Sequence, residues 1–164
     1  MSVTLPDLES VLREKAGHPA VAAIVSWNSE ALTEARWDRD ELTLTIAREE
    51  FLGAGVAIQQ AGYNFLEDVT AVDWFPASPR FQISYHIVSH QYKERIRLRV
   101  MVDEASASID SITPIWPSAN YYEREVFDLF GVRFDGHPNL RRIMMPEEWS
   151  GHPLRKDYPV EGYR

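Results

Sequence analysis

The residues that could do chemistry lie mainly in the last third of the chain. Glu125 and Asp128 are close enough in sequence to act as two carboxylates in acid–base catalysis, and His137 follows as a candidate third group. Together they would suit a self-sufficient hydrolase. Carboxylates at this spacing are frequent on ordinary helices, so the hydrolase is a minor hypothesis.

Histidine and cysteine chemistry finds little support in the sequence. His86 and His90 lie four residues apart on a predicted strand, which separates them by roughly 13 Å, too far to share a metal ion. His137 and His152 each precede a proline, which favours rigid extended turns over mobile bases. The chain has no cysteine, so it lacks disulfides and the usual ligands of iron–sulfur clusters. We therefore predict no catalytic residue, no cofactor site and no metal site on this chain.

The sequence also lacks the motifs of common nucleotide and hydrolase sites. No GxGxxG, P-loop, GxSxG or HExxH pattern occurs. The net charge of −8 argues against a nucleic-acid-binding protein, because affinity for phosphates needs clustered Lys and Arg. The basic stretch 95–100, RIRLRV, is expected to be a strand edge with a solvated face.

These residues must be positioned by a domain with its own core, for which 164 residues and 45% hydrophobic content are sufficient. The periodicity of apolar residues predicts, in chain order, a helix from about Leu5 to Gly17, strands over Ala20–Trp27 and Glu41–Ala47, a helix over Arg48–Gly62, a strand over Phe65–Phe75, and an antiparallel hairpin of Phe81–Ser89 and Arg95–Val102. The charged segment between the first two strands is expected to be a solvated turn. This order predicts a two-layer α+β domain, with helices on one face of a mixed, mainly antiparallel sheet.

A further helix is predicted from about Tyr121 to Phe130, with Asn120 as its N-cap, Glu123 as the capping-box partner, and Gly131 as its stop. No segment is long and apolar enough to span a membrane, and the first residues do not form a secretory leader, so a cytosolic protein is expected.

The charges of this helix separate by helical phase. Arg124, Glu125 and Asp128 share the arc opposite the core, where Arg124 and Asp128 have the spacing of a helix ion pair. Glu123 projects on the apolar side instead. Because an unpaired buried charge costs several kcal/mol, we expect Glu123 to pair with a cation.

The candidate partners of Glu123 are Arg141, Arg142 and Arg155, or a base on a partner chain. An edge position with only a capping role is the alternative.

The last residues have a different composition from the rest of the chain. Residues 1–132 hold 11 Lys and Arg against 20 Asp and Glu, whereas residues 133–164 hold 6 against 5. Proline and glycine interrupt this segment, yet it is rich in Trp, Met and Arg, which are enriched at buried interfaces. We predict a core domain over 1–131 and, over 132–164, an extended C-terminal arm that docks on a partner subunit.

The helix and the arm also carry a long motif. It consists of Glu123-Arg124-Glu125, Asp128, Leu129-Phe130, His137, Arg141 and Ile143-Met144, with the flanks SITPIWPSAN and GHPLRKDYPV. This pattern resembles the signature of the 30 kDa subunit family of the proton-pumping NADH-quinone oxidoreductase, respiratory complex I. The similarity covers about residues 111–160, and the predicted hairpin is similar as well.

The resemblance implies a non-catalytic subunit of the peripheral arm of complex I, on the cytoplasmic side of the bacterial membrane. It implies contact with the membrane only through the complex, and no binding of nucleic acid. The expected partners are the subunit that helps to form the quinone site, called here the quinone-site subunit, and other peripheral-arm subunits. FMN and the iron–sulfur clusters are expected on those other subunits, with no cofactor here. The C-terminal arm would lie along the quinone-site subunit and support it while electrons pass from NADH to quinone.

Related complexes share this signature, so the equivalent subunit of a membrane hydrogenase, of formate hydrogenlyase, or of an F420-dependent or photosynthetic NDH complex is the alternative, and a free adaptor outside any redox complex is another. The residues expected at the subunit interface are Glu123, Arg124, Glu125, Asp128, His137, Arg141, Arg142, Trp149, Arg155, Lys156, Asp157 and Tyr158.

Overall fold

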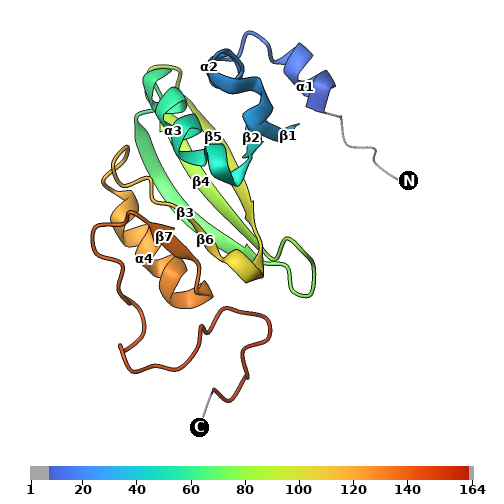
Figure 1. The fold of residues 1–164 in the computed structure, drawn as a ribbon. Coiled ribbons are helices and arrows are strands. Elements are labelled where there is room, and N and C mark those ends of the chain that lie inside the picture. Colours follow the sequence, from blue (N-terminus) through green and yellow to red (C-terminus); the bar gives the residue numbers. More distant parts are fainter. Residues whose placement is uncertain (1–7, 163–164) are drawn as a thin grey trace.

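The computed structural model describes residues 8–162, and Figure 1 shows their course. The helices and strands are α1 (Leu8–Glu14), α2 (Pro19–Asn28), β1 (Leu32–Asp38), β2 (Glu41–Ile46), α3 (Phe51–Gln60), β3 (Phe65–Asp73), β4 (Phe81–Ser89), β5 (Glu94–Val102), β6 (Ser108–Asp110), α4 (Ala119–Phe130) and β7 (Arg133–Asp135). The helix predicted from about Leu5 begins at Leu8 within this range, and its first predicted residues, 5–7, lie outside the described residues.

The main sheet has five strands in the order β1-β2-β5-β4-β3. Only β2 and β5 are parallel among these pairs, and the other neighbours are antiparallel. The predicted hairpin is confirmed as β4 and β5, which pair from Phe81 with Val102 to Ser89 with Glu94. The short strands β6 and β7 form a separate parallel pair. The predicted α+β class with a mixed, mainly antiparallel sheet is thus confirmed.

One helix was mistaken for a strand. The segment predicted as the strand Ala20–Trp27 is helix α2, which begins with Pro19 in its first turn. The side chain of His18 accepts a hydrogen bond from the Ala20 N–H at 3.3 Å and so caps the helix. A short apolar run fits a buried helix as well as a strand. The alanines and the proline at its start favour the helix.

Two predictions about the strands were also wrong. The supposed solvated turn contains β1, which pairs antiparallel with β2 from Leu32 to Asp38. As an edge strand it is half exposed, so its sequence lacks clear alternation. The basic stretch RIRLRV lies in β5, the middle strand of the sheet and not an edge. The order of strands in space is not encoded in the composition of any one strand.

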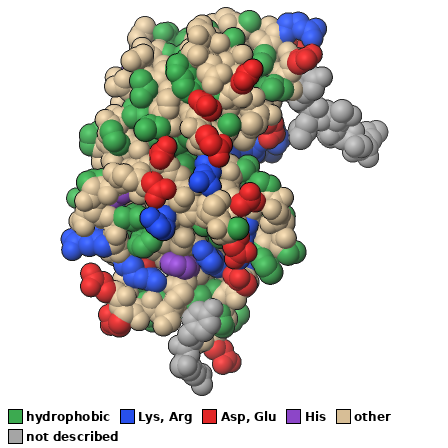
Figure 2. Space-filling view, viewed as in Figure 1, with side chains coloured by type: hydrophobic (Ala, Val, Ile, Leu, Met, Phe, Trp, Pro, Cys, Tyr) green, Lys and Arg blue, Asp and Glu red, His purple; other side chains and the backbone are tan. Residues whose placement is uncertain are grey.

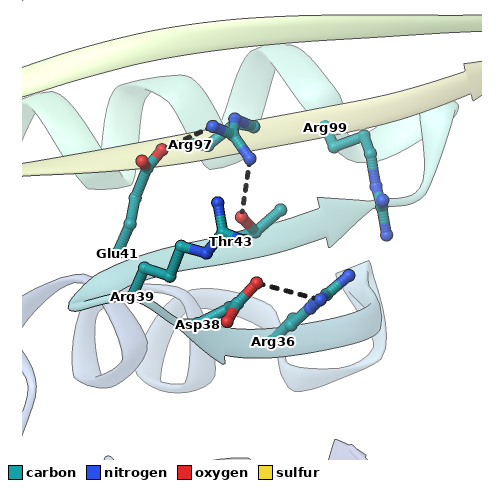
Figure 3. Close-up of a pocket in the computed structure, with 7 residues that line it drawn as sticks. All are labelled: Arg36, Asp38, Arg39, Glu41, Thr43, Arg97 and Arg99. Carbon is teal, nitrogen blue, oxygen red and sulfur yellow. Dashed lines mark hydrogen bonds and ion pairs between the residues drawn. The ribbon is translucent and has the colours of Figure 1, made fainter. Parts of the chain in front are cut away.

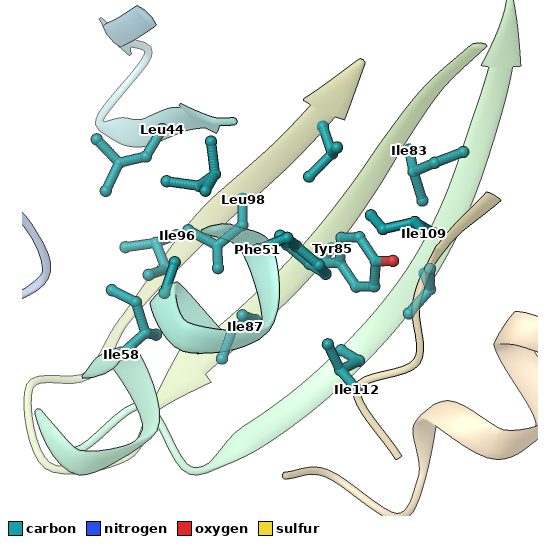
Figure 4. Close-up of a cluster of buried hydrophobic side chains, with 14 of the residues drawn as sticks. Leu44, Phe51, Ile58, Ile83, Tyr85, Ile87, Ile96, Leu98, Ile109 and Ile112 are labelled. Atoms are coloured by element: carbon teal, nitrogen blue, oxygen red, sulfur yellow. The ribbon is translucent and has the colours of Figure 1, made fainter. Parts of the chain in front are cut away.

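The core lies between the sheet and the helices, which cover one face of it (Figure 1). In Figure 4 the ring of Phe51 from α3 stands between side chains of three strands, among them Leu98 and Tyr85. The rings of Phe51 and Tyr85 have centroids 4.5 Å apart. Helix α4 lies against β3, the outer strand on the other side. The sheet therefore has one apolar covered face, while its opposite face is left to polar residues.

Gly53 in α3 permits a close contact between two helices. A Cβ atom added there would lie 2.2 Å from Cζ2 of Trp27, a residue at the end of α2. We predict that Gly53→Ala displaces this indole and lowers the free energy of unfolding by about 1–2 kcal/mol, since overpacking outweighs the better helix propensity of alanine. Urea unfolding checks this.

The matched control is Gly17→Ala, because a Cβ atom there would have no neighbour within 4 Å. Its effect should stay within about 0.5 kcal/mol. In a Trp27→Ala background, Gly53→Ala should no longer destabilise. An equal loss in both backgrounds would contradict the contact.

Candidate interaction site: helix α4 and the C-terminal arm

Helix α4 runs from Ala119 to Phe130, two residues earlier than predicted at its start. Its N-cap is Ser118, whose side chain makes no capping hydrogen bond, so the predicted capping box of Asn120 and Glu123 is wrong. The predicted stop is confirmed. Gly131 has φ of +75°, a left-handed conformation that suits glycine, and its N–H donates to the carbonyl of Phe127.

The arm completes the C-terminal end of α4. The last carbonyls of a helix lack partners within the helix. Here Nδ1 of His152 donates to the carbonyl of Asp128 at 2.9 Å, the Leu154 N–H donates to that of Leu129 at 3.0 Å, and Nε of Arg155 donates to that of Phe130 at 2.6 Å. The guanidinium also places a positive charge at the negative end of the helix dipole.

Asp128 lies at the centre of this contact. Its side chain has no exposed surface, although the helical phase predicted a solvated position. One carboxylate oxygen accepts the backbone N–H groups of Ile143, Met144 and Met145 at 2.9, 2.7 and 2.9 Å. The other accepts Nη1 of Arg142 at 2.7 Å. Burial by itself would raise the pKa of Asp128, but these four hydrogen bonds outweigh it and lower the pKa.

The predicted pair of Arg124 with Asp128 does not form, and Asp128 instead pairs with Arg142. Arg124 is 8% exposed and donates to the carbonyls of Arg141 and Arg142 at 3.1 and 3.2 Å. Of the three residues assigned to the solvated arc, only Glu125 is exposed. The arm covers this arc, so α4 is buried on two sides, whereas helical phase alone assumes one.

Glu123 is buried, as the phase predicted, but its partners are not the expected arginines. Its carboxylate accepts hydrogen bonds from Oγ of Ser111 at 2.6 Å and from the Ile112 N–H at 2.8 Å. Burial raises the pKa of Glu123 to about 7, and these two hydrogen bonds offset only part of that effect. Nε2 of His137 lies 4.0 Å away.

His137 does not supply the missing positive charge. Its Nδ1 accepts the Asn139 N–H at 3.0 Å, so this nitrogen carries no proton, and Nε2 donates to the carbonyl of Asn120 at 3.1 Å. The hydrogen-bond network thus assigns a neutral imidazole. Buried beside it, Glu123 is a carboxyl group without a cation.

The hydrolase hypothesis receives no support from this arrangement. The oxygens of Asp128 are filled by hydrogen bonds from the arm, and both nitrogens of His137 are engaged. Glu125 is exposed on another arc of α4. Among residues 8–162 no cluster of three or more His, Asp or Glu side chains could hold a metal ion.

A second anchor of the arm was not recognised in the sequence. Arg80 is buried and donates to both oxygens of Asp73 at 2.9 and 2.8 Å and to both oxygens of Asp157 at 3.1 and 2.6 Å. The Lys156 N–H also donates to Asp73, at 2.8 Å. Burial would raise the pKa of Asp73, but these bonds lower it to about 2. The only signal was an arginine directly before an apolar strand.

The remaining predicted residues lie on the outer part of the arm. Nε1 of Trp149 donates to the hydroxyl of Tyr158 at 3.1 Å, which closes the arm's last loop, and Arg141 is exposed. Several apolar side chains of the arm face outward, namely Ile143, Met144, Trp149 and Leu154, with exposures from 39% to 61%. Figure 2 shows acidic and basic side chains close together over α4 and the arm. We refer to these four side chains as the outer apolar residues.

Known proteins resemble this chain in sequence over most of its length. Residues 44–164 match the family described as respiratory-chain NADH dehydrogenase, 30 Kd subunit. A subunit of NADH-quinone oxidoreductase from Citrifermentans bemidjiense, the one designated by the letter C, is 45% identical over 144 residues, which is 87% of this chain and 89% of the relative.

Two solved structures have a similar fold. A trypsin-resistant fragment of Nqo5, residues 1–134, superposes with a TM-score of 0.65 at 30% identity, over 74% of this chain and 99% of the fragment. A chain of an archaeal respiratory membrane complex, the membrane-bound sulfane sulfur reductase, has a TM-score of 0.75 at 22% identity, over 89% of this chain and 86% of its own.

The buried Glu123 predicts a pH-dependent stability. Its pKa rises from an ordinary 4.5 to about 7 on folding. The folded state thus binds this proton more tightly than the unfolded chain, so the contribution is full below about pH 4.5 and is lost as the pH rises to about 7. Glu123→Gln removes this dependence. We expect the variant's stability relative to wild type to increase by about 3 kcal/mol across that range.

Urea unfolding of both proteins at several pH values measures this difference. The histidines with lowered pKa, His18, His86 and His152, change stability in the opposite direction but are present in both proteins. A difference that stays constant with pH would show that Glu123 is not buried in this way.

Asp128 predicts how firmly the arm is held. In Asp128→Asn the charge is lost and one oxygen acceptor remains for donors that now fill two, so we expect a loss of about 3 kcal/mol in stability. Trypsin should then cut faster after Arg142, whose guanidinium and following N–H are bound by Asp128. Glu125→Gln, an exposed change on the same helix, is the control. Equal cleavage rates in all three proteins would contradict this role.

Proposed function

Because this chain belongs to the family of the 30 kDa subunit of respiratory-chain NADH dehydrogenase, we propose that it is that subunit of an NADH-quinone oxidoreductase and helps to hold the quinone-site subunit in place. The match over residues 44–164 carries this proposal. The 45% identity over 87% of the chain to a subunit of that enzyme supports it.

The arm gives the proposal its structural basis. Its polar groups are engaged with its own domain through Asp128, the end of α4 and Arg80. The outer apolar residues are what remains for another chain, and Trp and Met are typical of interface centres. We propose that the quinone-site subunit, or another subunit of the peripheral arm, covers them. The arm would then be a preformed surface, with little ordering entropy lost on assembly.

This role does not require a reaction on the chain itself. FMN and the iron–sulfur clusters would be carried by other subunits. No helix within residues 8–162 is long and apolar enough to cross a membrane, so attachment at the cytoplasmic side of the membrane would run through the partner subunits.

A second candidate is the equivalent subunit of a related complex. The fold also occurs in an archaeal respiratory membrane complex that is a sulfane sulfur reductase. The 22% identity to that chain compares with 45% to the NADH-quinone oxidoreductase subunit of Citrifermentans bemidjiense. The sequence therefore favours the quinone complex over this alternative.

Charged substitutions on the outer apolar residues test the docking role. We predict that Ile143→Asp with Met144→Asp prevents co-purification of a tagged chain with the other subunits, because a carboxylate buried against an apolar partner costs several kcal/mol. The isolated variant should fold normally, since both side chains are exposed. Deleting the whole arm is less informative because the end of α4 would lose its partners.

The matched control is Val160→Asp, a similar change at a fully exposed position of the same arm. It should leave the complex intact. Full assembly with the double variant would refute the docking role of the arm, and a tagged wild-type chain that brings down no redox subunit would refute the proposed function as a whole.

A further inference from the structure

The face of the main sheet opposite the helices is not covered by any described residue. Side chains that alternate with the core residues point to this open face. Arg97 in β5 stands in one row with Thr43 of β2 and His86 of β4, its direct neighbours in the sheet. Figure 3 shows arginines of β1 and β5 on the near side of the strands, with helices behind.

The open face has a basic cavity of about 230 Å³ near the β1–β2 turn. Its lining consists of Arg36, Asp38, Arg39, Glu41, Thr43, Arg97 and Arg99. Four arginines against two carboxylates leave an excess of two positive charges. The whole chain carries −8, so the cavity has the opposite sign to its surroundings.

The guanidinium groups are held in place by neighbouring strands. Nε of Arg97 donates to Nε2 of His86 at 2.9 Å, and one of its Nη atoms lies 2.8 Å from Glu41. Nε of Arg99 donates to Oγ1 of Thr45 at 2.9 Å. Because Nε2 of His86 accepts a hydrogen bond, this imidazole adds no charge. The arginines are thus oriented before any partner arrives, which reduces the entropy lost on binding.

Arg39 adds a donor at the edge of the cavity. Its φ is +51° and that of Asp40 is +61°, values that hairpin turns normally assign to Asn or Gly. Such backbone strain costs of the order of 1 kcal/mol or more for each residue. Among the described residues Arg39 makes no ion pair with this chain's own carboxylates. A strained turn that presents an unpaired arginine indicates a role outside the chain.

An adjoining cavity of about 460 Å³ has a more apolar lining. It shares Arg36 and Arg99 with the basic cavity and adds Trp74, Pro79 and Met101. Trp74 is 51% exposed. Arginine, tryptophan and methionine are the residue types enriched where protein surfaces meet.

We propose that the open face is a second docking surface, on which another member of the complex inserts an acidic side chain into the arginine cavity and an apolar side chain beside Trp74. The charge excess fits one or two carboxylates, and the fork of a guanidinium binds a carboxylate through two hydrogen bonds. This proposal rests on the proposed function, because it needs the chain to be part of a complex. It concerns a surface separate from the arm.

Site-specific photo-crosslinking in the assembled complex tests this proposal. A photoreactive amino acid is placed at position 39 in one complex, at position 144 on the arm in a second, and at position 133, which is 70% exposed on β7, in a third. We expect position 39 to crosslink to an acidic segment of another subunit. Position 144 reports on the arm's partner independently.

Charge reversal gives a second measurement. In Arg36→Glu with Arg39→Glu, we expect about tenfold weaker association with the subunit that position 39 contacts, and loss of that subunit at lower salt than in wild type. Arg133→Glu, the same charge change elsewhere, should have no effect. Trp74→Ala tests the apolar cavity without altering charge. Circular dichroism of each isolated variant verifies folding.

Crosslinks from position 144 without any from position 39 would overturn this inference and leave the proposed function standing. Crosslinks from neither position would overturn both. Binding of inorganic phosphate to the isolated chain, lost in the double reversal, together with no crosslink from position 39, would show a small-anion site and would also overturn the docking surface.

Discussion

The buried carboxylate of Asp128 is the contact on which the C-terminal half of the molecule depends. It sits on α4, yet its hydrogen-bond donors, Arg142 and the N–H groups of residues 143–145, all come from the arm. A buried carboxylate without partners would be very costly. The helix can therefore be stable in this position only when the arm is in place. The two segments fold as one unit, although the sequence between them contains no regular element longer than β7.

The same dependence continues along the arm. His152, Leu154 and Arg155 fill the open carbonyls of α4, and Asp157 reaches the buried Arg80 beyond β3. Each polar contact uses a group of this chain, so the arm is fixed by hydrogen bonds, whereas most proteins fix such segments by apolar packing. Its apolar side chains are then left facing outward. This division explains how a segment rich in proline and glycine can be ordered and adhesive at once.

The main sheet divides its two faces in a comparable way. One face is apolar and carries the helices, while the other carries rows of arginine, threonine and carboxylate that pair across strands. Both unusual surfaces of the molecule, the outer apolar residues and the arginine cavity, thus lie outside its core. A protein that works by contact needs such surfaces more than it needs a reactive centre, and Glu123 and His137 are buried without access to a substrate.

The sequence by itself determined the α+β class, the β4–β5 hairpin, the end of α4 at Gly131 and the burial of Glu123, because these follow from local periodicity and the conformational freedom of glycine. It did not distinguish α2 from a strand, since a short apolar run suits both. The tertiary structure alone decided that Asp128 and Arg124 are buried, that Glu123 meets Ser111 and not an arginine, and that Arg80 receives the arm. Helical phase shows only which residues share a side of a helix. What covers that side is set by chain segments distant in sequence, and here it was the arm.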